Sequence, residues 1–325
     1  MTSRWGLASW RTLTTVLVAV ALAAAACGGS SDANTRTDEA ESEGAGSSDQ
    51  PTTVLRIGAI PDQEPERLQR TYGLLADYLE SALPDVTVEY VPVTDYQGAV
   101  TGFRTGDFDI VWFGGLTGVQ ARLEVDGANA IAQRDIDEAF TSVFIANASA
   151  GIDPVVDVAG LSVIEDHTFT FGSESSTSGR LMPQSFLSEA GLDLDVSFDG
   201  APGFSGSHDA TIELVKAGTF EVGALNSQVW DDRVVEGAVD PDQVIEIFRT
   251  PPYFDYHWVA QPDLDDRFGS GFTDLFVGAL TTLDGANPGH VEILELFGAG
   301  SFVATSNGNY AAIEAVGREA GLINE

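Results

Sequence analysis

The stretch Val54-Leu55-Arg56-Ile57-Gly58-Ala59-Ile60 opens the pattern that decides the fold. This short apolar run, closed by Pro61, is typical of a buried β-strand. A helix is predicted next, because the leucines and the tyrosine at positions 68, 72, 75, 79 and 83 recur at helical spacing. Residues 86–90 then alternate apolar and polar side chains, which predicts a second strand.

Alternation of strand and helix continues along the chain. We expect a helix at about 96–104, a strand at 109–113 and a helix at 116–123. The pattern restarts with strands at 169–172, 196–198, 222–225 and 245–248, helices at 177–189, 209–217 and 227–235, and a mainly helical part beyond 263. This order predicts an α/β fold with two lobes, each a mostly parallel sheet flanked by helices.

Composition limits the classes of function. The chain has 325 residues, 43% of them hydrophobic, which is enough for about two domains at roughly 100–200 residues each. Its 50 acidic and 15 basic residues give a net charge of −35. Such a negative field repels nucleic acid and anionic lipid. Binding of nucleic acid through a broad basic patch is therefore excluded. Any anionic ligand must be held by strong local groups.

The N-terminus predicts export and anchoring. Residues 1–26 have a positive front, a short apolar core and a small-residue end, which are the marks of a signal peptide. The sole cysteine, Cys27, follows directly and resembles the acylated cysteine of a bacterial lipobox. Residues 27–53 are polar and predict a disordered acidic tether. We therefore expect an extracytoplasmic protein on the outer face of the cell membrane; an ordinary signal peptide is the alternative.

The strongest local signal for a binding site is Ser175-Ser176-Thr177-Ser178-Gly179, between a predicted strand and a predicted helix. Free N–H groups and the dipole at a helix start bind anions, and neighbouring hydroxyls add neutral donors. The same residues would also serve as ordinary helix caps. A tetrahedral oxyanion bound by dipoles would fit the acidic composition.

Other junctions carry weaker signals. Ser205-Gly206-Ser207-His208-Asp209 offers a histidine donor with an acid that can orient it or cap the helix. Thr94-Asp95-Tyr96 offers a phenol, and Gly114-Gly115-Leu116-Thr117 is a further strand-to-helix turn. Capping, packing or surface roles would explain each of them equally well. Arg134 and Arg180 could supply positive charge or form ordinary ion pairs.

Catalysis and metal binding are not favoured. The sequence contains none of the nucleophile-elbow, phosphate-loop or zinc-protease motifs. Ser176, His208 and Asp209 contain the residue types of a triad, but adjacent His and Asp rarely form its base and orienter. A single cysteine and four scattered histidines indicate no metal site and no cofactor.

These motifs together resemble the phosphonate-type periplasmic binding proteins of ABC importers. The matching pieces are Gly58-Ala59-Ile60-Pro61, Asp95-Tyr96, Gly106-Asp107-Phe108-Asp109-Ile110, Phe113-Gly114-Gly115, Ser176-Thr177-Ser178-Gly179 and Ser205-Gly206-Ser207-His208-Asp209-Ala210. Three further pieces are similar to a subgroup labelled as selenate importers: Gln133-Arg134-Asp135, Leu225-Asn226 and Thr250-Pro251-Pro252-Tyr253-Phe254-Asp255-Tyr256.

The resemblance implies a two-lobed, type II-like periplasmic-binding-protein fold that closes on one small oxyanion and delivers it to a permease with its ATPase. It places lobe 1 at 54–148, lobe 2 at 149–255 and a return to lobe 1 at 256–325, with crossings near Ala148–Gly151 and Thr250–Tyr256. We expect a monomer that binds no nucleic acid. The ligand-binding set predicted from the resemblance and the junctions is Ser176, Thr177, Ser178, His208, Tyr96, Asp209 and Thr117.

The choice of oxyanion stays open among phosphonate, phosphite, phosphate, selenate and sulfate. A buried acceptor carboxylate would favour a ligand that carries a proton, and Asp62, Asp209 and Asp255 are the candidates. A ligand-sensing partner of a membrane receptor would share the same fold. A surface hydrolase is the remaining alternative.

Overall fold

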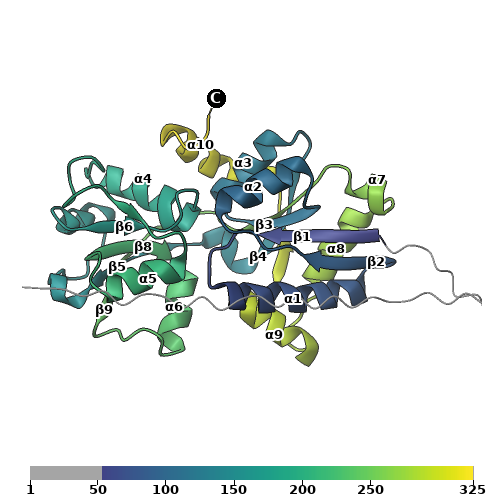
Figure 1. The fold of residues 1–325 in the computed structure, drawn as a ribbon, viewed down its shortest axis with the longest axis horizontal. Helices are drawn as coiled ribbons and strands as arrows, with labels where there is room; N and C mark the ends of the chain where they lie inside the picture. The colour runs from purple at the N-terminus through teal and green to yellow at the C-terminus, as the bar shows by residue number, and fades with distance from the viewer. Residues whose placement is uncertain (1–52, 325) are drawn as a thin grey trace, which may run out of the picture. The chain divides into compact units, whose positions relative to one another are not determined.

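The computed structural model describes residues 53–324. The predicted signal peptide, Cys27 and nearly all of the tether therefore lie outside the described residues. Two β-sheets with helices on both faces form the described part (Figure 1). None of the helices within residues 53–324 has the length and apolar character needed to cross a bilayer.

The first sheet has six strands in the order β11-β4-β10-β3-β1-β2. Strand β1 pairs in parallel with β2 and β3, whereas β10 runs antiparallel to β3 and β4, and β11 antiparallel to β4. The strands are β1 Thr53–Ala59, β2 Val86–Tyr90, β3 Ile110–Phe113, β4 Asn129–Arg134, β10 His257–Ala260 and β11 Phe302–Ala304.

Helices cover both faces of this sheet. Figure 1 shows α2 and α3 on one face and α1 with α9 on the other. The predicted leucine face of α1 is buried against the sheet, and α3 begins directly after β3. The helices are α1 Pro65–Ala82, α2 Tyr96–Thr105, α3 Gly115–Glu124, α7 Leu264–Phe268, α8 Phe272–Thr281, α9 Pro288–Phe297 and α10 Ala311–Glu319.

The second sheet has five strands in the order β7-β6-β8-β5-β9. Strand β6 pairs in parallel with β7 and β8, and β5 is antiparallel to β8 and β9. Its strands are β5 Ser142–Asn147, β6 Phe169–Phe171, β7 Gly203–Phe204, β8 Val222–Asn226 and β9 Val244–Arg249. Its helices are α4 Met182–Glu189, α5 His208–Lys216 and α6 Ser227–Val235.

The α/β class with two mostly parallel sheets and flanking helices is confirmed. Strands β1–β4 of the first sheet run in one direction and β10 and β11 in the other, whereas in the second sheet only β5 opposes the remaining strands. Residues 196–198, predicted as a strand, form turns instead. There the side chains of Asp193 and Ser197 bond to nearby backbone N–H groups and replace a strand ladder.

Two connections join the sheets. The chain leaves the first sheet at Arg134 and enters the second at Ser142, earlier than the predicted crossing at Ala148–Gly151. The short 3₁₀ turn Asp135–Ala139 makes this crossing, and β5, assigned to lobe 1 from the sequence, belongs to the second sheet. The apolar run of β5 gave no sign of which sheet it joins.

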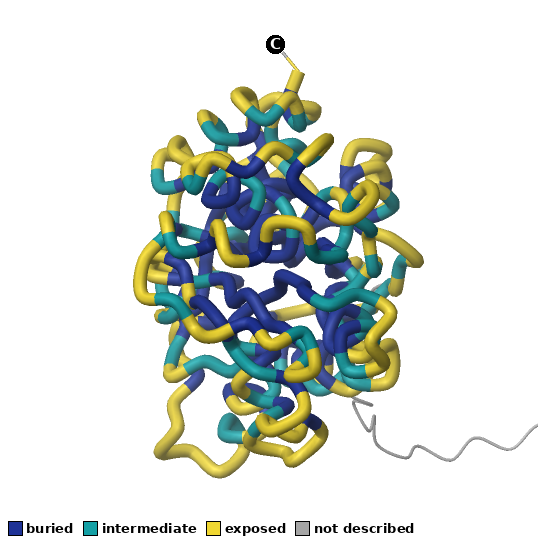
Figure 2. Tube along the Cα trace, turned by 90° about the vertical axis from the view of Figure 1, so that its left-hand side faces the viewer, coloured by how far each residue is buried: buried dark blue, intermediate teal, exposed yellow. Residues whose placement is uncertain are grey.

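The second connection, residues 250–256, lies beside the first. Phe140 and Tyr253 exchange two backbone hydrogen bonds of 2.9 Å each, and the Asp255 N–H donates to the Asp137 carbonyl at 3.1 Å. Figure 2 shows the buried residues in the interior of the chain trace and the exposed residues around its outside. The two short connections thus join two sheets that each have their own helices.

Candidate functional site

Four strand-to-helix junctions meet between the two sheets. The His208 N–H, at the start of α5, donates to the Asp62 carbonyl, just after β1, at 3.0 Å. The Leu116 N–H, at the start of α3, donates to Thr177 Oγ1 at 2.8 Å. A Cβ added at Gly114 would lie 3.1 Å from Thr177 Oγ1. Residues from both sheets therefore face one another where ligands bind in open α/β folds.

The serine-rich turn forms a π-helix, Thr177–Leu181, ahead of α4. Ser176 caps it, since its Oγ accepts the Gly179 N–H at 2.9 Å. The Ser178 hydroxyl is buried and has no hydrogen-bond partner within the described residues. π-Helical turns often mark functional sites, and a helix start leaves N–H groups without helical partners. The turn therefore has unused donors in a buried position.

Tyr96 is the first residue of α2, and Asp95 caps that helix. Its ring is buried, and its hydroxyl bonds to no atom of residues 53–324. Burial, and then the nearby Asp62 carboxylate, raise the pKa of Tyr96 well above its ordinary value. The phenol is therefore a neutral hydrogen-bond donor that lies near Ser176.

His208 begins α5 and is completely buried, with its ring carbon 3.2 Å from the position of a Cβ added at Gly179. Its Nδ1 accepts the Asn226 N–H at 3.4 Å, and its Nε2 lies 3.2 Å from the Tyr256 hydroxyl. Tyr256 in turn donates to Asp62 Oδ2 at 2.8 Å. Burial lowers the pKa of His208 to about 4, so the ring is neutral. Because Nδ1 accepts the Asn226 N–H, the ring proton lies on Nε2.

Asp255 lies on the second connection and is completely buried. Its Oδ1 accepts the Gly115 N–H at 2.8 Å, whereas Oδ2 has no hydrogen-bond partner in the described part of the chain. Burial raises the pKa of this carboxyl to about 7, against the opposing effect of the Gly115 hydrogen bond. Of the three acids considered from the sequence, only Asp255 has a fully buried carboxylate oxygen without a hydrogen-bond partner among residues 53–324.

The side chains of the other two acids form hydrogen bonds with protein groups. Asp62 accepts the Tyr256 hydroxyl, and burial raises its pKa to about 6. Asp209, predicted as a ligand group, has Oδ1 bonded to Arg233 Nε at 2.7 Å and Oδ2 bonded to the Glu64 N–H at 3.0 Å. Since both of its oxygens have protein partners, we do not retain Asp209 in the ligand set.

Three further predicted groups are also accounted for by protein contacts. Thr117 is buried, but its hydroxyl donates to the Gly114 carbonyl of its own helix cap. Arg134 forms a buried pair with Asp137, so its charge is already neutralised. Arg180 lies over the rings of Phe171 and Phe204, 5.0 and 4.8 Å from their centres.

Chemically, the junctions combine neutral donors with one acceptor. Ser178 and Tyr96 offer hydroxyls, helix starts offer N–H groups, and Asp255 offers an unpaired carboxylate oxygen. Neutral dipoles hold an oxyanion without a counter-charge, and a lone acceptor fits a ligand hydroxyl. Among residues 53–324 no cluster of histidines and acids could hold a metal ion.

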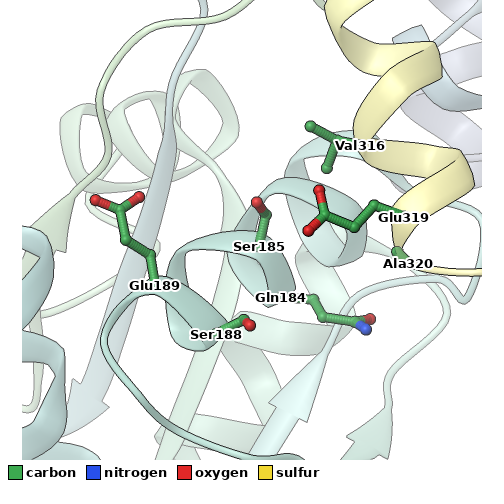
Figure 3. Close-up of a pocket in the computed structure, with 7 residues that line it drawn as sticks. All are labelled: Gln184, Ser185, Ser188, Glu189, Val316, Glu319 and Ala320. Carbon is green, nitrogen blue, oxygen red and sulfur yellow. The ribbon is translucent and has the colours of Figure 1, made fainter.

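A separate hollow of about 320 Å³ lies between α4 and α10 (Figure 3). It contains none of the predicted ligand groups and is lined by Gln184, Ser185, Ser188, Glu189, Val316, Glu319 and Ala320. Its two glutamates would repel an anion. The junctions around Ser178 and Asp255 are therefore the candidate site.

Comparison with known proteins shows the family of this chain. Residues 57–310 match the family model described as ABC transporter, phosphonate, periplasmic substrate-binding protein. The chain belongs to this family. Members of the phosphonate-binding family are extracytoplasmic substrate-binding proteins of ABC transporters and not enzymes, as the sequence predicted.

A similar relative in the phosphonate-binding family is the probable ABC transporter phosphite binding protein PhnD1 of Prochlorococcus marinus. It is 47% identical over 82% of this chain and 89% of its own length. Its solved complex with methylphosphonate matches with a TM-score of 0.81, covering 84% of this chain and all of the other. A Pseudomonas aeruginosa phosphonate-transporter component, 20% identical with a TM-score of 0.70 over 82% of this chain and 85% of its own, shares the fold.

Proposed function

We propose that this protein captures a small phosphorus oxyanion of the phosphite or methylphosphonate class and delivers it to an ABC permease and its ATPase. The observation that carries the proposal is a set of three buried polar atoms that have no hydrogen-bond partner within residues 53–324: Tyr96 Oη, Ser178 Oγ and Asp255 Oδ2. Buried polar atoms are normally hydrogen-bonded, so such a set points to a ligand. The complex of PhnD1 with methylphosphonate supports the same ligand class.

Asp255 supports a ligand that carries a proton. An ionised carboxylate can only accept hydrogen bonds, and a P–OH group can donate one. Sulfate and selenate have no proton at neutral pH, so they would face the ionised form of Asp255 with acceptors alone. We therefore favour phosphite or methylphosphonate over the selenate class. Ser176, Thr177 and His208 were predicted as ligand groups, but each already has a protein partner, so the proposal gives them the role of shaping and supporting the turn.

A thermal-shift screen tests the ligand class. Phosphite, methylphosphonate, phosphate, 2-aminoethylphosphonate, sulfate and selenate are compared at fixed ionic strength. A ligand that binds only the folded protein raises the melting temperature by mass action. We expect a saturable shift with phosphite or methylphosphonate. A shift with none of the six oxyanions would refute the proposed function.

The proposal also includes lipid anchoring and a monomeric state. Cys27 would take the acyl chains, since it is the sole cysteine and follows the predicted signal sequence directly. Two chains would hold the protein stably on the membrane surface. Mass spectrometry of the protein extracted from membranes tests the anchor, because an unmodified Cys27 there would contradict it.

Replacing Ser176 and Ser178 together with alanine should weaken oxyanion binding at least about tenfold. The first change removes the cap that holds the π-helical turn, and the second removes a free hydroxyl. Titration calorimetry with methylphosphonate provides the measurement. Asn287→Ala removes a cap from α9, outside the candidate site, and is the control for lost stability alone. Unchanged affinity in the double variant would rule out this turn as the anion site.

Methylphosphonate affinity should fall as the pH rises above about 7. Burial raises the pKa of Asp255 to about 7, so its carboxylate is charged above that pH. A deprotonated ligand would then face a charged carboxylate, so the complex must take up one proton when the ligand binds. Because binding is linked to this protonation, the affinity is expected to fall by up to about tenfold per pH unit. Calorimetry across neutral pH measures the affinity. An affinity that does not change with pH would show that Asp255 and the ligand share no proton.

A further inference from the structure

We infer that Arg67 is a positioning residue that holds the two lobes closed through an ion-pair network outside the ligand site. This inference rests on the proposed function for its ligand readout. Arg67 lies in the first turn of α1, which packs on the first sheet. Its partners Asp232 and Glu236 lie at α6, which packs on the second sheet.

The contacts form one connected network. Arg67 Nη1 lies 3.0 Å from Glu236 Oε1, and Arg67 Nη2 lies 3.5 Å from Asp232 Oδ2. Glu236 Oε2 accepts from Arg233 at 3.1 Å, so this glutamate bridges one arginine from each lobe. Arg233 also pairs with Asp209, whose second oxygen accepts the Glu64 N–H from the first lobe.

The lobes are in direct contact beside this network. The space enclosed by Asp62, Trp112 and Tyr256 on one side and Asn226 on the other is only about 20 Å³. Rotation about residues 135–141 and 250–256 that separates α1 from α6 would break both Arg67 ion pairs. The pairs therefore contribute only to the closed arrangement and should act on ligand release.

The positive charge of Arg67 lies between carboxylates of the two lobes. Isolated exposed ion pairs contribute little, but the Arg67 side chain is only 21% exposed and has two carboxylate partners. Glu64 of the first lobe lines the same hollow as Asp209 and Glu236 of the second. Without the guanidinium, carboxylates of the two lobes would face each other in a chain of net charge −35.

The central experiment compares Arg67→Gln with Arg70→Gln. Both variants lose one charge from α1, but Arg70 pairs with Glu292 inside the first lobe. Stopped-flow release of methylphosphonate should be about threefold to tenfold faster in Arg67→Gln, with little change in association, and unchanged in Arg70→Gln. High salt should speed release from the unmodified protein but not from Arg67→Gln. Equal release rates in the two variants would overturn the inference.

A second readout separates this inference from the proposed function. Spin labels on cysteines introduced at Asp77 and Val235, in a Cys27→Ser background, report the distance between the lobes without any ligand. Arg67→Gln should increase the population at long distances, and an unchanged distribution would also count against Arg67. If no oxyanion binds the unmodified protein, the proposed function fails, whereas the label distances still decide the role of Arg67.

Discussion

Asp255→Asn should lower the preference for methylphosphonate over sulfate by about tenfold to a hundredfold. The asparagine Oδ1 can still accept the Gly115 N–H, which donates to Asp255 at 2.8 Å. Its amide then places donors where the unpaired carboxylate oxygen stood. A ligand P–OH would lose its charged acceptor, a hydrogen bond worth about 1.5–3 kcal/mol. Sulfate, which has only acceptors, would gain a donor.

The ratio of the two affinities is the quantity to measure, because a general weakening of the fold would lower both affinities together. Asp209→Asn is the matched control. It also removes one buried carboxylate charge near the cleft, but both Asp209 oxygens already bond to Arg233 and Glu64. We expect Asp209→Asn to leave the ratio unchanged. An unchanged ratio in Asp255→Asn would mean that Oδ2 does not face the ligand.

Arg134→Met should lower the free energy of unfolding by about 3–5 kcal/mol. Its guanidinium lies beside the hinge and binds both oxygens of Asp137, at 2.6 and 2.8 Å. The Asp137 side chain is completely buried, so the variant leaves a carboxylate without its counter-charge. Arg134 also lies over the ring of Tyr256, 4.9 Å from its centre, on the second connection. Urea denaturation measures the loss.

Two companion variants make this test specific. Arg134→Met combined with Asp137→Asn should recover part of the lost stability, because the remaining buried side chain is then neutral. Arg249→Met removes a bidentate pair with Asp231 that is much more exposed, and should cost less than about 1 kcal/mol. Equal costs for Arg134→Met and Arg249→Met would show that burial adds nothing to the Arg134 pair.

Local patterns predicted the elements well where each element has its own amphipathic signature. The spaced leucines gave α1, the alternation at 86–90 gave β2, and the run at 227–235 gave α6. Strands β4, β5 and β10 were not predicted. They are buried at nearly every residue and lack alternation, as does β3, which was predicted, so a buried strand of this kind is recognised only in some cases. The directions of these strands also depend on where the chain crosses between sheets, and no local signal carries that information.

The placement of the candidate site residues could be predicted, but not which of their polar atoms have protein partners. Hydroxyls at the serine turn and the phenol of Tyr96 could be placed at helix starts from the sequence. Whether an oxygen stays free depends on partners far along the chain. Asp255 is held by an N–H 140 residues away, and Asp209 by one 145 residues away. Asp255 was therefore one of three candidate acids until the fold was known.

Periodicity, capping and composition act over short distances, so they were enough to predict the α/β class, the acidic character and the helix starts that can bind an anion, and the motifs indicated the family. The folded chain was needed to show which junctions meet, which carboxylate has a buried unpaired oxygen and which arginine pairs across the lobes. Those properties depend on contacts between distant segments, which the two sheets and the two connections between them bring together. Their physical basis is long-range hydrogen bonding and burial, which no single stretch of the chain contains.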